Sequence, residues 1–128
     1  MAQILLVEPD TVLAKTYAAA LQKSGHHVLR AQDAQSAINA TDAVPTDCIV
    51  LELRLPAHNG VEFLYELRSH ADWQTIPVII LSQLTLDGVG LDETKMQELG
   101  VKAFCYKPQT SLTMLCTVIE EILRVTTS

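Results

Sequence analysis

The sequence predicts an α/β fold, a doubly wound five-stranded parallel sheet with helices on both faces. Five short apolar runs alternate with segments of helical spacing, and this order requires parallel strands joined by right-handed crossovers. The runs are almost continuously apolar, which indicates strands that are covered on both faces. With 128 residues and 48% hydrophobic content, the chain is expected to form one domain over residues 1–128.

The predicted strands share a β-branched, apolar composition. They are Ile4–Val7, His27–Ala31, Cys48–Leu51, Val78–Leu81 and Ala103–Tyr106. The predicted helices repeat apolar residues at intervals of three and four. They are Thr11–Lys23, Asp33–Ala43, Val61–His70 and Leu112–Val125, the last with the clearest amphipathic stripe.

Local signals set the expected ends of these helices. Asp10 or Thr11 is expected to cap the first helix, and Thr110 or Ser111 the last. Gly25 stands where the first helix would end. A turn is expected at Asn59-Gly60.

The segment Leu86-Asp87-Gly88-Val89-Gly90 interrupts the pattern between the last two strands. Each glycine inside a helix costs about 1 kcal/mol relative to alanine. We therefore expect a flexible loop here, followed by a short helix that begins near Leu91 or Asp92.

Composition excludes several classes of protein. Cys48, Cys105 and Cys116 have no CxxC spacing, which favours reduced core thiols in a reducing compartment, and hence the cytoplasm. A net charge of −6 argues against direct binding of nucleic acid, whereas a basic partner protein is compatible with it. The apolar runs are far shorter than the roughly 20 residues of a membrane-spanning helix.

Chemistry-bearing residues follow four of the predicted strands. In a doubly wound sheet, sites form outside the carboxyl ends of the strands. Residues Glu8 to Asp10, Glu52, Ser82 and Lys107-Pro108 are therefore expected to converge at one edge.

This constellation resembles the response-regulator receiver family. The likeness rests on ILLVEPD, IVLELRLPAHNGVEFLYELR, IPVIILS and GVKAFCYKP, which occur in the order and at nearly the separations that the family uses. It implies a flavodoxin-like receiver fold with strand order 2-1-3-4-5 and a role in two-component signal transduction.

The resemblance also implies roles for individual residues. In that family, an Asp ending the third strand takes a phosphoryl group from a histidine kinase, and two acidic residues after the first strand hold Mg²⁺. Glu52 stands at the phosphoacceptor position and Glu8 at the first acidic position. Ser82 and Phe104 occupy the switch positions, and Lys107 that of the lysine that contacts the phosphoryl group.

Two departures from the family pattern concern the reaction itself. Glu52 carries its carboxylate one methylene further out than Asp, and in-line attack depends on placement within about an ångström. Pro9 stands where the second acidic ligand belongs and offers no side-chain oxygen. Asp10, the next residue, is better placed to cap the following helix than to replace the missing acidic ligand. Glu8, Asp10 and Glu52 thus remain weak candidates for a metal, and no cofactor is expected.

The carboxylates of Glu8, Asp10 and Glu52 would repel one another unless a positive charge lies near them. We expect Arg54 or Lys107 to supply the positive charge that Mg²⁺ supplies in active relatives, although a solvent-pointing Arg54 is an equally ordinary outcome. Glu52 would imitate a phosphorylated Asp if it reached Lys107 or Ser82. The opposite outcome, a pocket locked in the inactive state, is also open.

We therefore expect an atypical receiver domain that acts as a non-enzymatic interaction module without aspartyl phosphorylation. The alternative is a functional phosphoreceiver of a phosphorelay, which uses Mg²⁺ and accepts a phosphoryl group from a histidine kinase. The expected partner is another signalling protein, bound through the family's fourth helix, fifth strand and fifth helix. A homodimer is a further option, and no membrane contact is expected.

Overall fold

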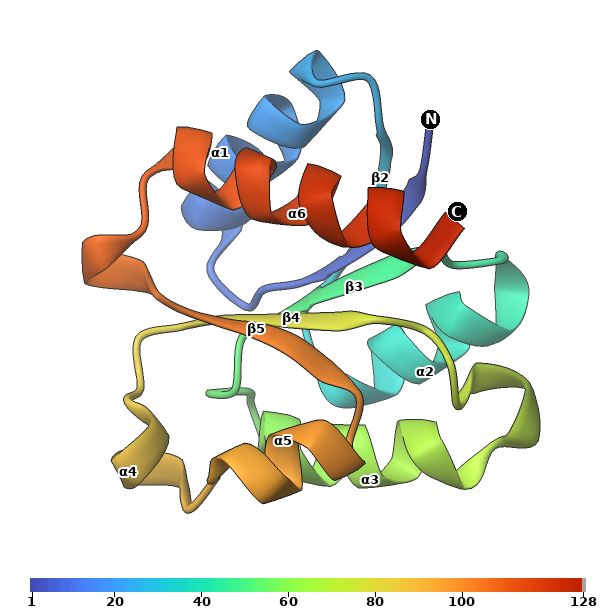
Figure 1. Cartoon of the computed structure of the whole chain (residues 1–128), viewed down its shortest axis with the longest axis vertical. Helices are drawn as coiled ribbons and strands as arrows, with labels where there is room; N and C mark the ends of the chain where they lie inside the picture. The colour runs from blue at the N-terminus through green and yellow to red at the C-terminus, as the bar shows by residue number, and fades with distance from the viewer. Residues whose placement is uncertain (128) are drawn as a thin grey trace.

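The computed structural model describes residues 1–127 and places a five-stranded parallel sheet between two helical layers (Figure 1). The strand order is β2-β1-β3-β4-β5, which confirms the prediction. The strands are β1 (Gln3–Val7), β2 (His27–Ala31), β3 (Cys48–Leu51), β4 (Val78–Ser82) and β5 (Val101–Tyr106).

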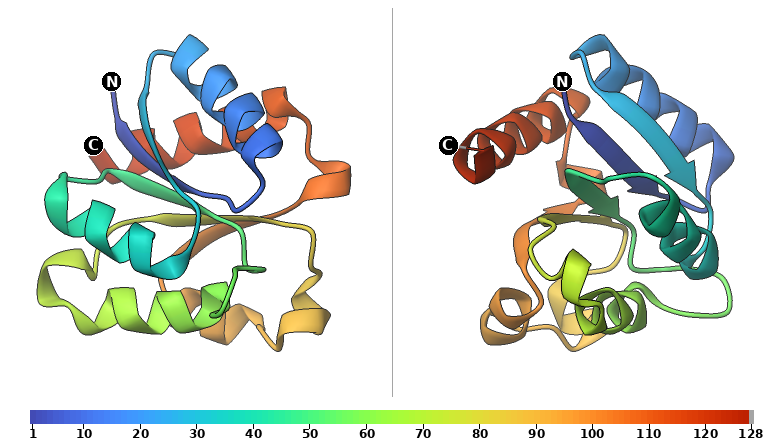
Figure 2. Two further views of the ribbon diagram at one scale, coloured as in Figure 1. Left: turned by 180° about the vertical axis from the view of Figure 1, so that it is seen from behind. Right: turned by 90° about the vertical axis from the view of Figure 1, so that its right-hand side faces the viewer.

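Helices connect successive strands and cover both faces of the sheet. They are α1 (Thr11–Lys23), α2 (Ala34–Ala43), α3 (Gly60–Ser69), α4 (Leu86–Val89), α5 (Glu93–Glu98) and α6 (Leu112–Thr127). Short 3₁₀ turns occupy η1 (Ala71–Trp73) and η2 (Lys107–Gln109). Figure 2 shows α1 and α6 on one face of the sheet and α2, α3 and α5 on the other.

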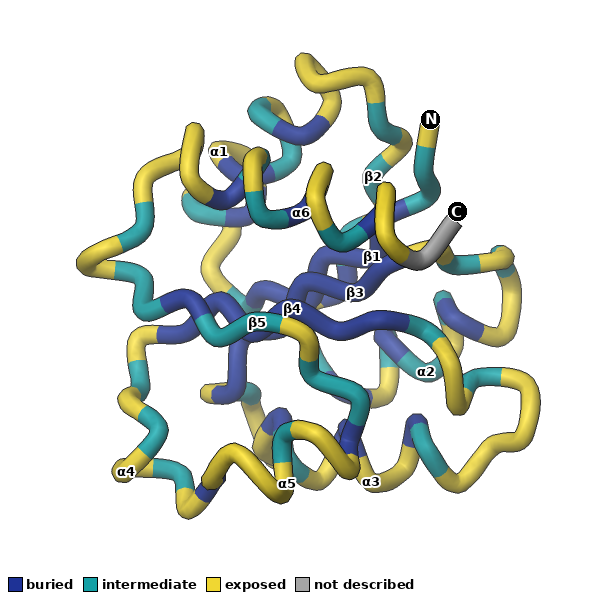
Figure 3. Tube along the Cα trace, in the orientation of Figure 1, coloured by how far each residue is buried: buried dark blue, intermediate teal, exposed yellow. Residues whose placement is uncertain are grey.

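The core consists of two apolar layers, one on each face of the sheet. Strand β1 divides its side chains between them: Leu5 and Val7 pack under α2 and α3, and Ile4 and Leu6 pack under α1 and α6. Strands β3 and β4 are buried along their whole length, and β1 is buried except at Gln3 (Figure 3). Burial on both faces explains why the strand sequences are apolar at almost every position.

Capping side chains correct two predicted helix boundaries. Asp33 precedes α2 and accepts a hydrogen bond of 2.7 Å from the Ser36 N–H. Asn59 likewise accepts from the Glu62 N–H at 2.9 Å, so Asn59-Gly60 starts α3 and forms no separate turn. Both side chains satisfy a first-turn N–H that lacks a partner within its own helix.

The N-terminal caps of α1 and α6 are among the residues that the sequence predicted. Asp10 caps α1 by accepting from the Leu13 N–H at 2.9 Å. Ser111 accepts from the Met114 N–H at 3.1 Å at the start of α6.

The segment Leu86–Val89 was expected to be a loop, and this prediction is wrong. It forms the one-turn helix α4, which Thr85 caps and Gly90 ends at φ 71°. Gly88 costs little in so short a helix, and Gly90 adopts the left-handed conformation that often follows a helix. The next helix, α5, begins at Glu93 with Asp92 as its cap, close to the predicted start.

Gly60 allows the loop after β3 to fold back tightly. Its N–H donates a hydrogen bond of 2.7 Å to the Leu53 carbonyl oxygen. A Cβ atom at Gly60 would lie 2.7 Å from the Leu53 Cα, closer than real side chains approach. The loop that follows Glu52 is thereby held against the start of α3.

The three cysteines are free thiols, as expected. Cys48 and Cys105 are buried and Cys116 is partly exposed. Burial raises the pKa of the Cys48 thiol to about 12. Within residues 1–127, no helix is both long enough and apolar enough to cross a bilayer.

Candidate functional site

Four predicted site residues meet at the carboxyl edge of the sheet. Glu8 and Glu52 follow β1 and β3, Ser82 ends β4, and Lys107 follows β5. The Lys107 Nζ lies 2.6 Å from Glu8 Oε1 and 2.7 Å from Glu52 Oε1. At most 7% of any of these three side chains is exposed. The site therefore contains a buried cation bridging two buried carboxylates.

The Glu52 carboxylate accepts four hydrogen bonds. Its Oε1 accepts from Lys107 and from the Gln83 N–H at 3.1 Å. Its Oε2 accepts from the Ser82 hydroxyl and from the Arg54 N–H at 3.0 Å. Because a carboxylate has about four lone-pair sites, Glu52 has no acceptor capacity left.

The same contacts tie the loop after β4 to Glu52. Gln83 donates its N–H to the carboxylate, and the Leu84 N–H donates to Ser82 Oγ at 3.0 Å. Ser82 at the end of β4 and the two loop residues that follow it are thus bound to Glu52, directly or through the serine hydroxyl. The loop leads into α4.

Arg30 holds the loop after β1, and sequence reasoning missed it. Its Nε donates to the Glu8 carbonyl oxygen at 3.1 Å and its Nη2 to the Pro9 carbonyl oxygen at 3.0 Å. The Glu8 side chain in turn accepts from the Asp10 N–H at 3.0 Å through Oε2. The one sequence feature that could have pointed to Arg30 is its charge, since it lies within β2, a strand otherwise rich in apolar residues.

The remaining candidate residues lie around this centre. Pro9, Asp10 and Arg54 line a pocket of about 320 Å³ beside Glu8 and Glu52. Asp10 is exposed and serves as the α1 cap. Arg54 is exposed, and within residues 1–127 its guanidinium forms no ion pair. Of the two cations considered for the pocket, Lys107 is the one that contacts the carboxylates.

Phe104 lies three residues before Lys107 on β5. It pairs in register with Ile80 of β4 and packs, partly buried, against the apolar layer under α2, α3 and α5. Its ring thus belongs to the layer that supports α4 and α5, while Ser82 pairs with Tyr106.

Burial and hydrogen bonding shift the pKa values of Glu52 and Lys107 in opposite directions. Burial alone would raise the pKa of Glu52, but hydrogen bonds from Lys107, Ser82 and the Arg54 N–H lower it below its ordinary 4.5. For Lys107, burial favours a lower pKa, but hydrogen bonds to Glu52 and Glu8, together with their charges, raise the pKa above 10.5. Both groups are therefore ionised at neutral pH.

These shifts predict how stability depends on pH. The contribution of Glu52 is present above pH 4.5, its ordinary pKa, and is lost as pH falls through the lowered pKa of the folded protein. The contribution of Lys107 is present below pH 10.5 and is lost as pH rises through its raised pKa. Urea unfolding should show a fall in stability as the pH drops below 4.5, and this fall should be shallower in Glu52→Gln. An equal slope in the variant would contradict this assignment.

The donor set does not fit a Mg²⁺ ion in this arrangement. The ion requires near-octahedral oxygen ligands at roughly 2.1 Å. Lys107 Nζ already bridges Glu8 Oε1 and Glu52 Oε1, and Glu52 accepts hydrogen bonds at every lone-pair site. A metal ligated by these carboxylates would have to displace Lys107 or a backbone donor.

Curated relatives show what the chain is similar to. It is 31% identical over 121 residues to response regulator RR06 of Streptococcus pneumoniae, covering 94% of this chain and 52% of the relative. It is 29% identical over 108 residues to the KDP operon transcriptional regulatory protein KdpE of Escherichia coli, covering 84% and 45%. The chain thus spans about half the length of these relatives.

Solved structures share the fold. A sensor protein from Polaromonas sp. JS666 has a TM-score of 0.86 at 21% identity, with 96% of each chain covered. The chemotaxis response regulator CheY4 of Vibrio cholerae has a TM-score of 0.83 at 20% identity, covering 95% of this chain and 98% of that one.

The family match covers the whole site. The response regulator receiver domain family matches residues 4–119, a range that includes every site residue described above, strands β2 to β5 and all of β1 except Gln3. The chain therefore belongs to the response regulator receiver domain family.

Proposed function

We propose that this chain is an atypical receiver domain that works as a cytoplasmic protein-interaction module without aspartyl phosphorylation. The observation that carries the proposal is the fully occupied carboxylate of Glu52. A carboxylate whose lone pairs all accept hydrogen bonds is a poor nucleophile, because attack on phosphorus must first break one of them.

Glu52 takes the part of a phosphorylated Asp in this proposal. The receiver resemblance assigns a hydroxyl and a lysine to the phosphoryl oxygens, and here Ser82 and Lys107 both bond to the Glu52 carboxylate. The additional methylene of Glu carries the carboxylate toward the place that phosphoryl oxygens would take. The hydrogen bonds to Ser82 and Gln83 then hold the loop after β4 permanently in one conformation.

Pro9 and Lys107 remove the need for Mg²⁺. Pro9 has no side-chain oxygen to offer, and Lys107 neutralises Glu8 and Glu52 from a position between them. One ammonium group thus supplies the positive charge that the metal supplies in phosphorylated relatives.

The proposed partner is another signalling protein with a basic surface. It would bind the face formed by α4, α5, β5 and α6, in which Phe104 and the tethered loop after β4 take part. Along α4 and α5, acidic side chains outnumber the one lysine, and they include Asp87, Asp92, Glu93 and Glu98. This excess of negative charge favours a basic protein and disfavours nucleic acid.

Phosphorylation by a small phosphodonor tests the proposal. The protein is incubated with acetyl phosphate and Mg²⁺, and its intact mass is measured. We expect no added phosphoryl group. A mass increase of one phosphoryl group that disappears in Glu52→Gln would instead establish the functional phosphoreceiver.

A double variant provides the matched control. Glu52→Asp combined with Pro9→Asp shortens the carboxylate and restores the missing oxygen ligand, so it should bind Mg²⁺ more tightly than the wild type. Calorimetric titration with Mg²⁺ measures this directly. Equal Mg²⁺ affinities in the two proteins would contradict the role given to these two positions.

A further inference from the structure

A groove of about 440 Å³ lies between the first half of α3 and the one-turn helix α4. Apolar side chains line it, and they include Leu53, Val61, Leu84 and Val89. Figure 2 shows α3 on one side of α4 and α5 on the other, so the groove opens on the α3 side of α4. A hollow of this size accommodates one large apolar side chain of a ligand.

Tyr65 of α3 forms an aromatic wall of the groove and is 50% exposed. Its hydroxyl accepts a hydrogen bond of 3.3 Å from Lys95 Nζ of α5. The same ammonium lies 6.0 Å from the centroid of the ring. Lys95 thus holds the ring from the α5 side, and a ring that is already fixed loses little entropy when a ligand packs on it.

Two of the apolar walls belong to the segments that Glu52 holds. Leu53 lies between Glu52 and Arg54, whose N–H donates to the Glu52 carboxylate at 3.0 Å. The Leu84 N–H donates to Ser82 Oγ at 3.0 Å, and the Ser82 hydroxyl in turn donates to Glu52. The shape of the groove therefore depends on the carboxylate site.

Exposed acidic side chains border the groove. Glu62 lines it, Glu66 follows one turn later on α3, and Asp87 precedes Gly88, which lines it on the α4 side. The Glu62 carboxylate lies 3.6 Å from the His58 imidazole. Within residues 1–127, Glu66 and Asp87 form no ion pair. Their charges are therefore available to a ligand with basic side chains.

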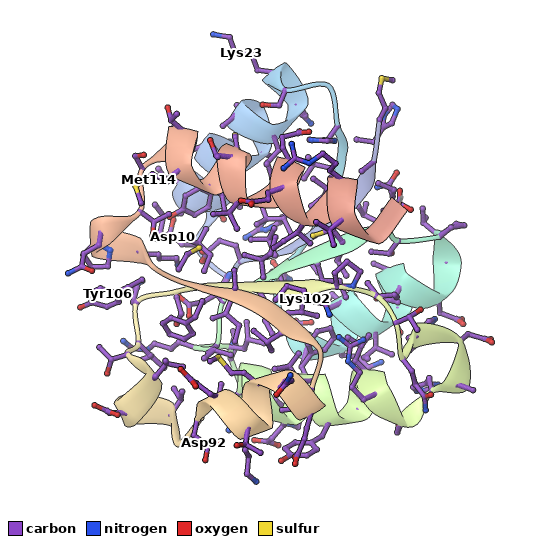
Figure 4. All side chains as sticks on the ribbon, in the orientation of Figure 1. Asp10, Lys23, Asp92, Lys102, Tyr106 and Met114 are labelled. Carbon is purple, nitrogen blue, oxygen red and sulfur yellow. The ribbon has the colours of Figure 1, made fainter. Side chains whose placement is uncertain are left out.

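The helices around the groove add negative charge and little positive charge. Figure 4 shows Asp92 between α4 and α5, and Glu93 follows it in the sequence. The basic side chains of α3 and α5 are engaged within the protein, since Arg68 donates to backbone carbonyl oxygens and Lys95 to the Tyr65 hydroxyl. The groove thus combines an apolar interior with an acidic border.

We propose that this groove binds a segment of a partner protein in which one large apolar side chain is flanked by lysine or arginine residues. The apolar side chain packs between Leu84 and Tyr65, and the flanking cations face Glu62 and Glu66. Recognition through an apolar anchor in a groove is a common mode of peptide binding. The inference rests on the proposed function, because it adds α3 to the surface that the basic partner contacts.

A synthetic peptide of about twelve residues tests the proposal. It contains alanines and lysines with one leucine at its centre, and it is titrated into the isotope-labelled full chain at low salt while amide chemical shifts are recorded. We expect a dissociation constant below about 1 mM, with shifts at Val61, Glu62 and Val89. Replacing the leucine with alanine should weaken binding at least about fivefold, because the anchor is lost. Replacing the lysines with glutamates should abolish binding.

Filling the groove should remove the preference for leucine. A Cβ atom at Gly88 would lie 3.4 Å from Thr85 Oγ1, an ordinary contact distance, and leucine favours a helix more than glycine does. Gly88→Leu should therefore fold, which its amide spectrum verifies in the same experiment. We expect this variant to bind the leucine and alanine peptides equally. A retained fivefold preference would overturn the proposal.

A pair of charge variants locates the bound peptide. Glu62→Gln combined with Glu66→Gln should raise the dissociation constant at least about threefold. Glu93→Gln combined with Glu98→Gln is the matched control, since it removes two exposed charges from α5 and likewise includes one glutamate of the first helical turn. It should change the constant by less than about twofold. The reverse order of effects would place the peptide on the α5 side and overturn the proposal.

Glu52→Gln tests the link between the carboxylate site and the groove. It should reduce the preference for the leucine peptide, because Leu53 and Leu84 lose the hydrogen bonds that position their backbone. An unchanged preference would overturn this link.

The wild type decides between failure of the groove and failure of the proposed function. Equal binding of the leucine and alanine peptides, or no binding at about 1 mM, overturns the groove. Neither result bears on phosphorylation, which incubation with acetyl phosphate measures separately. A phosphorylated Glu52 in a protein that still prefers the leucine peptide would overturn the proposed function and leave the groove in place.

Discussion

Replacing Lys107 with Met should lower the free energy of unfolding by about 3–5 kcal/mol, because it leaves two buried carboxylates without their shared cation. Lys107 Nζ contacts Glu8 Oε1 and Glu52 Oε1 at 2.6 and 2.7 Å. Met retains most of the apolar stem, so the loss reports mainly the missing charge. Urea unfolding at neutral pH measures it.

The matched control is Lys102→Met, at an exposed position of β5 that forms no ion pair within residues 1–127. It should change stability by less than about 0.5 kcal/mol. The deficit of Lys107→Met should also shrink at acid pH, because protonation of Glu52 removes an uncompensated charge. A deficit below about 1 kcal/mol at neutral pH would mean that the cation contributes little.

Replacing Arg68 with Met should lower the free energy of unfolding by about 3 kcal/mol or more, because its guanidinium donates to several carbonyl oxygens at once and methionine has no donor to offer them. Arg68 Nε donates to the Leu99 carbonyl oxygen at 2.8 Å, and its two terminal nitrogens donate to those of Trp73 and Ile76 at 2.7 Å each. It thereby joins α3 to the segments that enter β4 and β5.

Lysine should not rescue this position, because a single ammonium cannot reach carbonyls in such different directions. Arg68→Lys should therefore lose more than half of the stability that Arg68→Met loses. Arg54→Met changes an exposed side chain that forms no ion pair in the described part of the chain, so it serves as the control and should be nearly neutral. Full rescue by Lys would show that the charge of Arg68 matters and its planar shape does not.

The sequence predicted the sheet and the centre of the site for the same reason. Strands such as Ile49 to Leu51 are apolar on both faces because both faces are covered, and this pattern survives in the sequence. Strand order and the edge at which Glu8, Glu52 and Lys107 meet then follow from topology.

Other features of the structure depend on contacts between individual side chains, which leave no periodic pattern in the sequence. Arg30 and Arg68 bind carbonyl oxygens that are distant in sequence, so neither residue could be given a role from spacing. The choice between Lys107 and Arg54 was decided by which side chain points inward, a property of backbone direction. The helix at Leu86–Val89 depends on the Thr85 cap, which outweighs the cost of Gly88.

We propose that the Glu52 carboxylate holds the loop after β4 in one conformation. Amide hydrogen exchange at Arg54 and Gln83 tests this most directly, because both N–H groups donate to Glu52. In Glu52→Gln, one acceptor oxygen becomes an amide that cannot accept, so exchange at one or both should accelerate at least about tenfold. Asp87→Asn, an exposed change in α4, should leave both rates as they are. Unchanged exchange at Arg54 and Gln83 in Glu52→Gln would contradict the account.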